Sequence, residues 1–247
     1  MPIKRISRNN LGDEVRRILI KHIKNKGFGE TGAMPSEEGL ASQLGVSRVT
    51  IRDALAALER EGYVIRKHGK GTYANYRVID IKTPLAPAQE IGKLLKANGY
   101  QPTTTVVATY CKPANEEIAN VLNIKEGTET LTVEKLFFAD GVPAVFCVDT
   151  FPMSVIGDVD ISELDFNKSV FEIVERKSGL KINYDIAEIS PVSADRKLAL
   201  LLKCQVGSPL LLIEAIEYTE ENNPIMLIYE YYYSNFIRFK SLRLTGY

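Results

Sequence analysis

Arg48, Thr50 and Arg52 lie close together and carry side chains that can hydrogen-bond to the edges of DNA bases. Ser47 directly precedes them and is a good N-cap residue, so we expect a helix to begin there. The first turns of a helix in the major groove are the turns that meet base edges. The apolar face of the same helix is expected to hold Val49, Ile51, Ala54, Leu55 and Leu58.

Two further helices are expected to support this recognition helix. Pro35 stands where the missing N–H of a first helical turn costs nothing. Leu40 and Leu44 follow with apolar helical spacing, and Gly45 fits the left-handed cap that ends a helix. A similar apolar pattern predicts another helix over residues 11–26.

A basic hairpin is predicted after the recognition helix. Gly62 ends that helix, and the β-branched and aromatic residues that follow are typical of a strand. His68, Gly69, Lys70 and Gly71 form a tip that can approach a phosphate backbone or enter the minor groove. The whole pattern predicts a winged helix-turn-helix that reads duplex DNA. The alternative is a small helical bundle with a solvated basic face.

The charge of the chain is divided between its two parts. Residues 1–75 hold 14 Lys and Arg against 8 Asp and Glu, which gives a net charge of +6. Residues 76–247 hold 17 against 23, a net charge of −6. A basic domain beside an acidic one is the electrostatic pattern expected of a DNA-binding protein, and it argues against the simple bundle.

The basic segment resembles the DNA-binding domain of the GntR family of bacterial transcription regulators. The resemblance lies in the pieces MPSEEGLA, LGVSRVTIRDAL, LEREGYV and HGKGTY. It implies that the start of the recognition helix and the tip of the wing contact operator DNA. The implied DNA-binding residues are Ser47, Arg48, Thr50, Arg52, Lys67, His68, Gly69 and Lys70. Glu38 stands where some relatives have a basic residue.

The rest of the chain predicts a second, α+β domain. We expect the winged helix-turn-helix over residues 1–75, a linker over 76–84 and the second domain over 85–247. Asp140-Gly141 is a strong hairpin signal, and most of the predicted strands are joined by hairpins, which favours an antiparallel sheet with flanking helices. No internal repeat is evident. The expected helices are 88–98, 113–122, 169–178 and 194–202, and the expected strands are 103–110, 129–139, 144–151, 182–192, 209–219 and 225–234.

This second pattern resembles UTRA, the ligand-sensing domain of the HutC branch of the GntR family. The resemblance lies in ADGVPAVFCVDTFP, NKSVFEIVERKSGL, LLKCQVGSPLLLIEAIEYTEENNPI and YYYSNFIRF. It implies a fold similar to that of chorismate lyase. It also implies a homodimer, a double-stranded operator with two half-sites, and a small effector that changes operator affinity.

The resemblance also suggests where the effector binds. Ser169 and Tyr232 match residues of members that sense sugar phosphates, and Lys135 stands where such members often have arginine. Cys147 and Met226 replace two glutamates that are usual in those members. The implied effector is therefore a sugar phosphate or another polar metabolite.

Strand alternation points to two acids in the same region. Asp149 and Glu230 lie on otherwise apolar strand faces, and burying an unpaired charge is costly. We expect Lys135, Asp149, Ser169, Glu230 and Tyr232 to bind the effector, whose partner group would be hydroxyl-rich or cationic. The alternative is a structural ion pair or acids at exposed strand ends. The tyrosines of 229–233 are expected to pack in the core or at a dimer interface rather than to stack on bases.

Composition excludes several other classes of protein. No stretch approaches the roughly 20 apolar residues of a membrane span, and the start MPIKRISRNN lacks the apolar stretch of a signal peptide. Three separated cysteines and two histidines give no metal-ligand spacing, so we expect a reduced, cytoplasmic protein without metal or cofactor.

The sequence thus predicts a dimeric, effector-responsive transcription regulator and favours a repressor, with activation as the open alternative. Two alternatives are an enzyme like chorismate lyase and a DNA binder without effector response. No Ser/His/Asp set or phosphate loop is evident, and both histidines fall in the DNA-binding half, which argues against catalysis.

Overall fold

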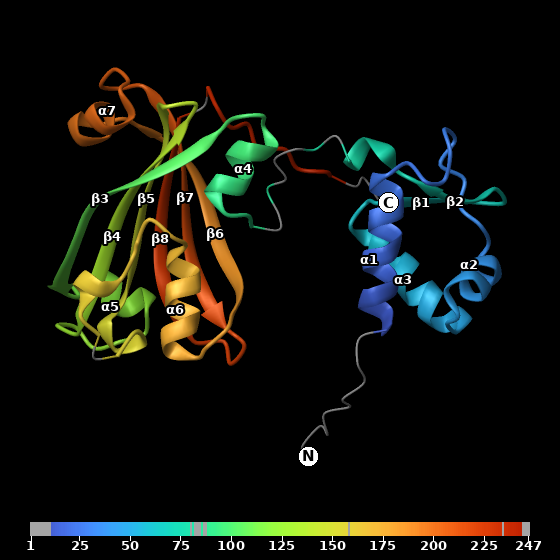
Figure 1. The fold of residues 1–247 in the computed structure, drawn as a ribbon, viewed down its shortest axis with the longest axis horizontal. Coiled ribbons are helices and arrows are strands. Elements are labelled where there is room, and N and C mark those ends of the chain that lie inside the picture. Colours follow the sequence, from blue (N-terminus) through green and yellow to red (C-terminus); the bar gives the residue numbers. More distant parts are fainter. Residues whose placement is uncertain are drawn as a thin grey trace, which may run out of the picture. The chain divides into compact units, whose positions relative to one another are not determined.

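The chain divides into two compact units in the computed structural model, which describes residues 11–79, 81, 85, 88–157, 159–233 and 235–243. The first unit comprises Met1–Pro84 with Lys240–Tyr247, and the second comprises Leu85–Phe239 (Figure 1). Residues 80 and 82–84 of the expected linker lie outside the described residues. The two-domain α+β architecture predicted from the sequence is confirmed.

The first unit is a helical bundle with a two-stranded hairpin. Its core forms because Val15, Leu19 and Ile23 recur at a spacing of four and face Leu55 and Leu58, whose side chains are also almost fully buried. Along the chain its elements are α1 (Leu11–Lys24), α2 (Glu37–Leu44), α3 (Arg48–Arg60), β1 (Val64–Lys67), β2 (Gly71–Ala74) and the 3-10 helix η1 (Tyr76–Val78).

The second unit is a six-stranded antiparallel sheet of order β3-β4-β5-β8-β7-β6. Its helices are α4 (Ile91–Ala97), α5 (Glu116–Val121), α6 (Val170–Ser178) and α7 (Arg196–Leu202), with short 3-10 turns η2 (Met153–Val155) and η3 (Ile161–Glu163). Its strands are β3 (Pro102–Pro113), β4 (Glu129–Ala139), β5 (Val142–Pro152), β6 (Ile182–Ser193), β7 (Pro209–Thr219) and β8 (Pro224–Tyr233).

Each face of this sheet packs against different helices. On the first face, the apolar residues of β4, β5, β7 and β8 form one core with α4 and α6. On the second face, Leu136, Phe146 and Leu210 form a smaller core with α7. Because side chains alternate along a strand, Lys135 and Asp149 share the first face with the apolar residues of β4 and β5 in this core.

The sheet is built from two similar halves, a structural repeat that is not evident in the sequence. Strand, helix and hairpin follow one another as β3-α5-β4-β5 and again as β6-α7-β7-β8. Asn115 and Asp195 cap the two equivalent helices, and each accepts a hydrogen bond from the backbone N–H three residues later. Gly127 and Gly207 then take matching positive φ angles of 81° and 85° before β4 and β7. Few identical residues mark the repeat, which is why the sequence did not reveal it.

The register at the centre of the sheet relates specific residues of the two halves. Strands β4 and β7 correspond end to end in the repeat, so Lys135 is equivalent to Ala215. Lys135 pairs with Cys147 and Ala215 pairs with Ile228, which makes Cys147 equivalent to Ile228 and Asp149 equivalent to Glu230. Of the two equivalent positions 135 and 215, only the first carries a cation.

Candidate functional site

A tight turn between α2 and α3 sets the start of the recognition helix. Gly45 adopts φ 66° and ψ 32°, a left-handed conformation that glycine takes without strain, and its N–H donates to the Ala41 carbonyl. Ser47 then begins α3, and its hydroxyl accepts a hydrogen bond from the Thr50 N–H at 3.1 Å. The two hydroxyls, Ser47 Oγ and Thr50 Oγ1, also lie 2.8 Å apart. Ser47 thus serves as the helix cap.

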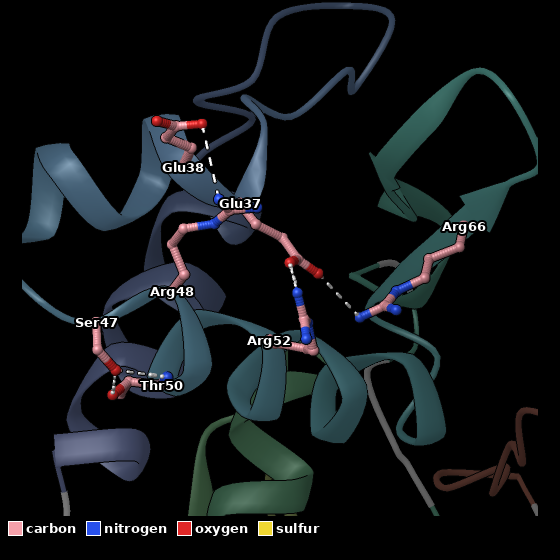
Figure 2. A network of polar contacts seen from close by, with 7 residues as sticks. All are labelled: Glu37, Glu38, Ser47, Arg48, Thr50, Arg52 and Arg66. Carbon is pink, nitrogen blue, oxygen red and sulfur yellow. Dashed lines mark hydrogen bonds and ion pairs between the residues drawn. The ribbon is translucent and has the colours of Figure 1, made fainter.

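Acids of α2 hold the two arginines at the start of α3 (Figure 2). Arg52 Nε donates to Glu37 Oε2 at 3.2 Å. Arg48 Nη1 lies 4.0 Å from Glu38 Oε2 in a more exposed pair. Both arginine side chains remain more than half exposed, so they stay accessible to a phosphate or a base edge.

Arg66 of β1 extends this network to the hairpin. Its Nη2 lies 3.9 Å from Glu37 Oε1, and its Nε lies 3.3 Å from Glu59 Oε2 of α3. Glu37 therefore uses one oxygen for Arg52 and the other for Arg66, as Figure 2 shows. One carboxylate of α2 therefore contacts both the recognition helix and the wing strand.

The tip of the hairpin is open to solvent. His68, Gly69 and Lys70 are exposed, and the Lys70 N–H closes the turn on the Lys67 carbonyl at 2.9 Å. Lys67 Nζ lies 4.2 Å above the centre of the Tyr73 ring, a cation–π contact that directs the ammonium along the hairpin. The predicted wing residues thus form one basic, exposed turn.

Val49 departs from the sequence prediction. We expected it on the buried face of the recognition helix, but its side chain is 64% exposed, whereas Ile51 is fully buried. The helix is packed on its Ile51, Leu55 and Leu58 stripe, which turns Val49 outward beside Arg48 and Arg52. An apolar side chain at that place can contact the methyl group of thymine.

In the second unit, four of the five predicted effector residues, Lys135, Asp149, Glu230 and Tyr232, lie on the first face of the sheet. Lys135 and Asp149 are each 4% exposed, and Tyr232 is 1% exposed. The Tyr232 hydroxyl donates to Glu230 Oε2 at 2.7 Å. The Cys147 thiol donates to Asp149 Oδ1 at 3.3 Å. The structure therefore brings four of the five predicted residues into one buried polar cluster.

Ser169, the fifth predicted residue, lies at the N-cap of α6. Its hydroxyl is buried, and no partner among the described residues has the geometry of a hydrogen bond to it. It nevertheless lies near the Glu90 carboxylate. The pKa of Glu90 is lowered mainly by Lys93, and Ser169 adds to this lowering, whereas burial opposes it. Lys135 Nζ donates to the carbonyl of Lys168, directly before Ser169, at 2.8 Å. This bond links the sheet cluster to the start of α6.

Burial dominates the acid–base properties of the cluster. It raises the pKa of Asp149 to about 6, although Lys135 and the Cys147 thiol act in the opposite direction. Burial also raises the pKa of Glu230 to about 7, against the hydrogen bond from Tyr232 and with the repulsion of Asp149. These carboxyl groups titrate close to neutral pH, where a ligand's charge can decide their protonation.

Comparison with known proteins identifies the two units. Residues 11–74 match the family described as bacterial regulatory proteins, gntR family, and residues 97–238 match the UTRA domain family. The chain belongs to the GntR-family regulators that carry a UTRA domain. This GntR-family chain is a DNA-binding transcription regulator and not an enzyme, and its UTRA domain responds to a small-molecule effector.

Relatives of known sequence cover most of the chain. The HTH-type transcriptional regulator YurK of Bacillus subtilis is 25% identical over 86% of this chain and 86% of its own length. The HTH-type transcriptional repressor NagR of the same organism is 26% identical over 84% of each chain.

Two solved structures share the fold. Bacillus subtilis YydK, described as a possible transcriptional regulator, has a TM-score of 0.73 at 18% identity, covering 94% of this chain and 99% of its own. PhnF from Mycobacterium smegmatis has a TM-score of 0.60 at 24% identity, covering 94% of this chain and 100% of its own.

Sequence reasoning missed one acid of the UTRA cluster. Glu217 of β7 is 6% exposed, and no hydrogen bond or ion pair reaches it from the described part of the chain. Burial, with repulsion from Asp185, Glu230 and Asp149, raises its pKa to about 8. The available signal was its position two residues after Ala215, which places an acid on the same apolar strand face as Ile213 and Ala215.

Other chemistry finds no support in the described ranges. No group of three or more His, Cys, Asp or Glu there could hold a metal ion. Among the residues searched, no helix is long and apolar enough to cross a membrane. Cys111, Cys147 and Cys204 are all free thiols, and Cys111 is exposed.

Proposed function

We propose that this regulator is a homodimeric repressor that binds an operator of two half-sites and releases it when an effector occupies the UTRA domain. The proposed domains are residues 1–75 for DNA binding, 76–84 as linker and 85–247 for effector binding and dimerisation. A repressor fits the names of two relatives. They are NagR and a probable fructoselysine utilization operon transcriptional repressor of Escherichia coli, which is 25% identical over 90% of this chain.

The exposed start of α3 carries the proposal for DNA binding. Arg48, Thr50 and Arg52 would read base edges in the major groove, with Ser47 capping the helix beneath them. At the wing, Lys67, His68, Gly69 and Lys70 would contact phosphate or enter the minor groove and set affinity more than sequence preference.

A selection experiment tests this reading. Duplexes enriched from random-sequence DNA by the wild-type chain should show two related half-sites, which mirror a two-fold dimer. Lys70→Ala should weaken binding to all duplexes alike and reduce the salt dependence by about one phosphate contact. A loss of sequence preference in Lys70→Ala would contradict the division of roles between helix and wing.

Exposed apolar side chains support the homodimer. Ile186 of edge strand β6 is 58% exposed on the second face of the sheet, and Leu200 of α7 is 80% exposed. Stable interfaces bury about 1,600 Å² in total and are enriched in such residues at their centre. Native mass spectrometry should find a dimer, and Ile186→Glu with Leu200→Glu should shift it towards monomer. A monomer in the wild-type chain would contradict the proposal.

The buried polar cluster carries the proposal for the effector. Lys135, Asp149, Ser169, Glu230 and Tyr232 would bind a polar metabolite through a hydroxyl-rich or cationic part. Carboxyl groups with raised pKa values can accept hydrogen bonds from hydroxyls or release a proton to pair with a cation. A sugar phosphate would use its hydroxyls on the acids and its phosphate on Lys135 and Ser169.

A ligand screen followed by mutation tests the effector site. Any compound that binds the folded chain tightly raises its melting temperature by linkage, so sugar phosphates and amines can be compared directly. The compound that does so should also weaken operator binding, since it must bind the two states unequally. Asp149→Ala should reduce its affinity, and unchanged affinity would exclude Asp149 from the site.

A further inference from the structure

Glu37 holds two arginines that belong to different elements of the DNA-binding unit. Its Oε2 lies 3.2 Å from Nη2 of Arg52 on α3, and its Oε1 lies 3.9 Å from Nη2 of Arg66 on β1. The Glu37 side chain is 25% exposed, the least of the acids in this network. Ser36, directly before it, caps α2 and fixes the first turn of that helix.

A free arginine side chain at a DNA surface can reach several phosphates as well as a base. A guanidinium held by a carboxylate loses part of that freedom, because its planar donors are directed by the bond it already makes. Arg66 is restrained a second time by Glu59 of α3 at 3.3 Å, so the wing strand and recognition helix are tied at two places. Figure 2 shows Glu37 between the two guanidinium groups.

We propose that Glu37 is a positioning residue for sequence discrimination: its carboxylate directs Arg52 toward a base edge and fixes the wing strand to the recognition helix through Arg66. This inference rests on the proposed base contact of Arg52. Glu37 itself repels the DNA backbone, so it lowers the affinity for non-operator DNA while it sharpens the preference for the operator.

The test compares Glu37→Gln with the wild-type chain on two duplexes. One is a duplex enriched from random-sequence DNA by the wild-type chain, and the other is a shuffled duplex of equal length and composition. The variant should bind the shuffled duplex more tightly, with a salt slope steeper by about one phosphate contact. The ratio of the two affinities should fall about fivefold or more, the discrimination of a weak bidentate base contact.

Glu14→Gln is the matched control. Glu14 is exposed on α1, and its variant loses the same charge as Glu37→Gln. Among the described residues Glu14 makes no ion pair or hydrogen bond. It should leave the affinity ratio unchanged. The melting temperature of Glu37→Gln should stay near the wild-type value, because exposed ion pairs contribute little to stability. A fall in discrimination without a fall in melting temperature identifies positioning rather than a folding defect.

Two further variants separate the possible failures. Arg66→Gln should reduce discrimination as Glu37→Gln does, and the double variant should lose little more than either single variant. If Arg52→Ala retains the sequence preference, the proposed base contact is wrong. If Arg52→Ala loses it but Glu37→Gln keeps the wild-type ratio, or changes both affinities equally, the positioning role of Glu37 is wrong.

Discussion

The two units hold their charged side chains in opposite ways. In the DNA-binding unit, acids and arginines alternate in space around Glu37, and most of these groups are a quarter to four-fifths exposed. In the UTRA unit, Asp149 and Glu217 are buried and Glu230 is partly buried beside them, and Lys135 is the base that lowers the pKa of Asp149. The exposed pairs can exchange partners at small cost when DNA arrives. The buried acids respond to a change of partner by changing protonation.

The largest effect is expected from Glu217→Gln, which tests whether burial controls the UTRA acids. The folded-state pKa of Glu217 is about 8 against an ordinary 4.5, so the folded chain retains a proton that the unfolded chain has lost between those values. The free energy of unfolding should therefore fall as pH rises from 5 to 8, by up to about 1.4 kcal/mol per pH unit for one proton.

Urea denaturation across this pH range measures the slope. Glu217→Gln should make it shallower by the share of one proton, so that the variant gains about 3 kcal/mol relative to the wild-type chain between pH 5 and 8, while Asp149 and Glu230 keep part of the slope. Glu220→Gln, an exposed neighbour in the hairpin turn, should keep the wild-type slope. Parallel slopes for wild type and Glu217→Gln would show that Glu217 is solvated and would remove it from the buried cluster.

Arg52→Ala tests the exposed side of the comparison. Removing a side chain that contacts a base should cost about 2 kcal/mol of operator binding and relax the preference at one position of each half-site. Arg17→Ala, an exposed arginine of α1, is the control for loss of charge. The two variants can be ranked by titrating the selected and shuffled duplexes. Equal losses of binding free energy on both duplexes would show that Arg52 contacts phosphate rather than a base.

Lys135→Met tests how much the buried Lys135 contributes to the stability of the UTRA unit. Lys135 opposes the rise in the pKa of Asp149, so its loss should raise that pKa above about 6. At pH 8 the ionised Asp149 would lose its compensating charge, and the free energy of unfolding should fall by about 1.5 kcal/mol. At pH 5 Asp149 is largely protonated in either chain, and the loss should be smaller. Lys177→Met on the exposed side of α6 should show no such pH dependence.

Ser47→Ala should have the smallest effect. Without its hydroxyl, the Thr50 N–H loses its acceptor at the start of α3, at a cost of about 1 kcal/mol. Hydrogen exchange of the α3 amides would detect this as faster local opening of the recognition helix, with Ser42→Ala in α2 as control. Unchanged exchange in α3 would mean that the cap contributes nothing there.

The DNA-binding unit was largely predictable because its signals are local. Gly45 and Ser47 end one helix and begin the next within three residues, and each acts through its own backbone or a hydrogen bond inside one turn. The strands 129–139 and 209–219 were predicted with their observed bounds for a similar reason, since alternation and turn residues mark them.

What the sequence missed depends on contacts between distant segments. Val49 has an apolar side chain of the kind found in cores, and it is exposed because α3 packs through another face. Glu217 lies beside the buried polar cluster because β7 pairs with β8 in a register that places it opposite Met226. The ion pairs of Glu37 span α2, α3 and β1, and no spacing in the sequence specifies them.

The two halves of the UTRA sheet leave a final consequence. Asp149 and Glu230 are equivalent by register, whereas their neighbours differ: Lys135 in one half corresponds to Ala215 in the other, and Phe137 corresponds to Glu217. A molecule placed across the middle of the sheet would meet a cation and an aromatic ring on one side and a methyl group and an acid on the other. The two halves are therefore chemically unlike, and a ligand with unlike ends placed there would favour one orientation.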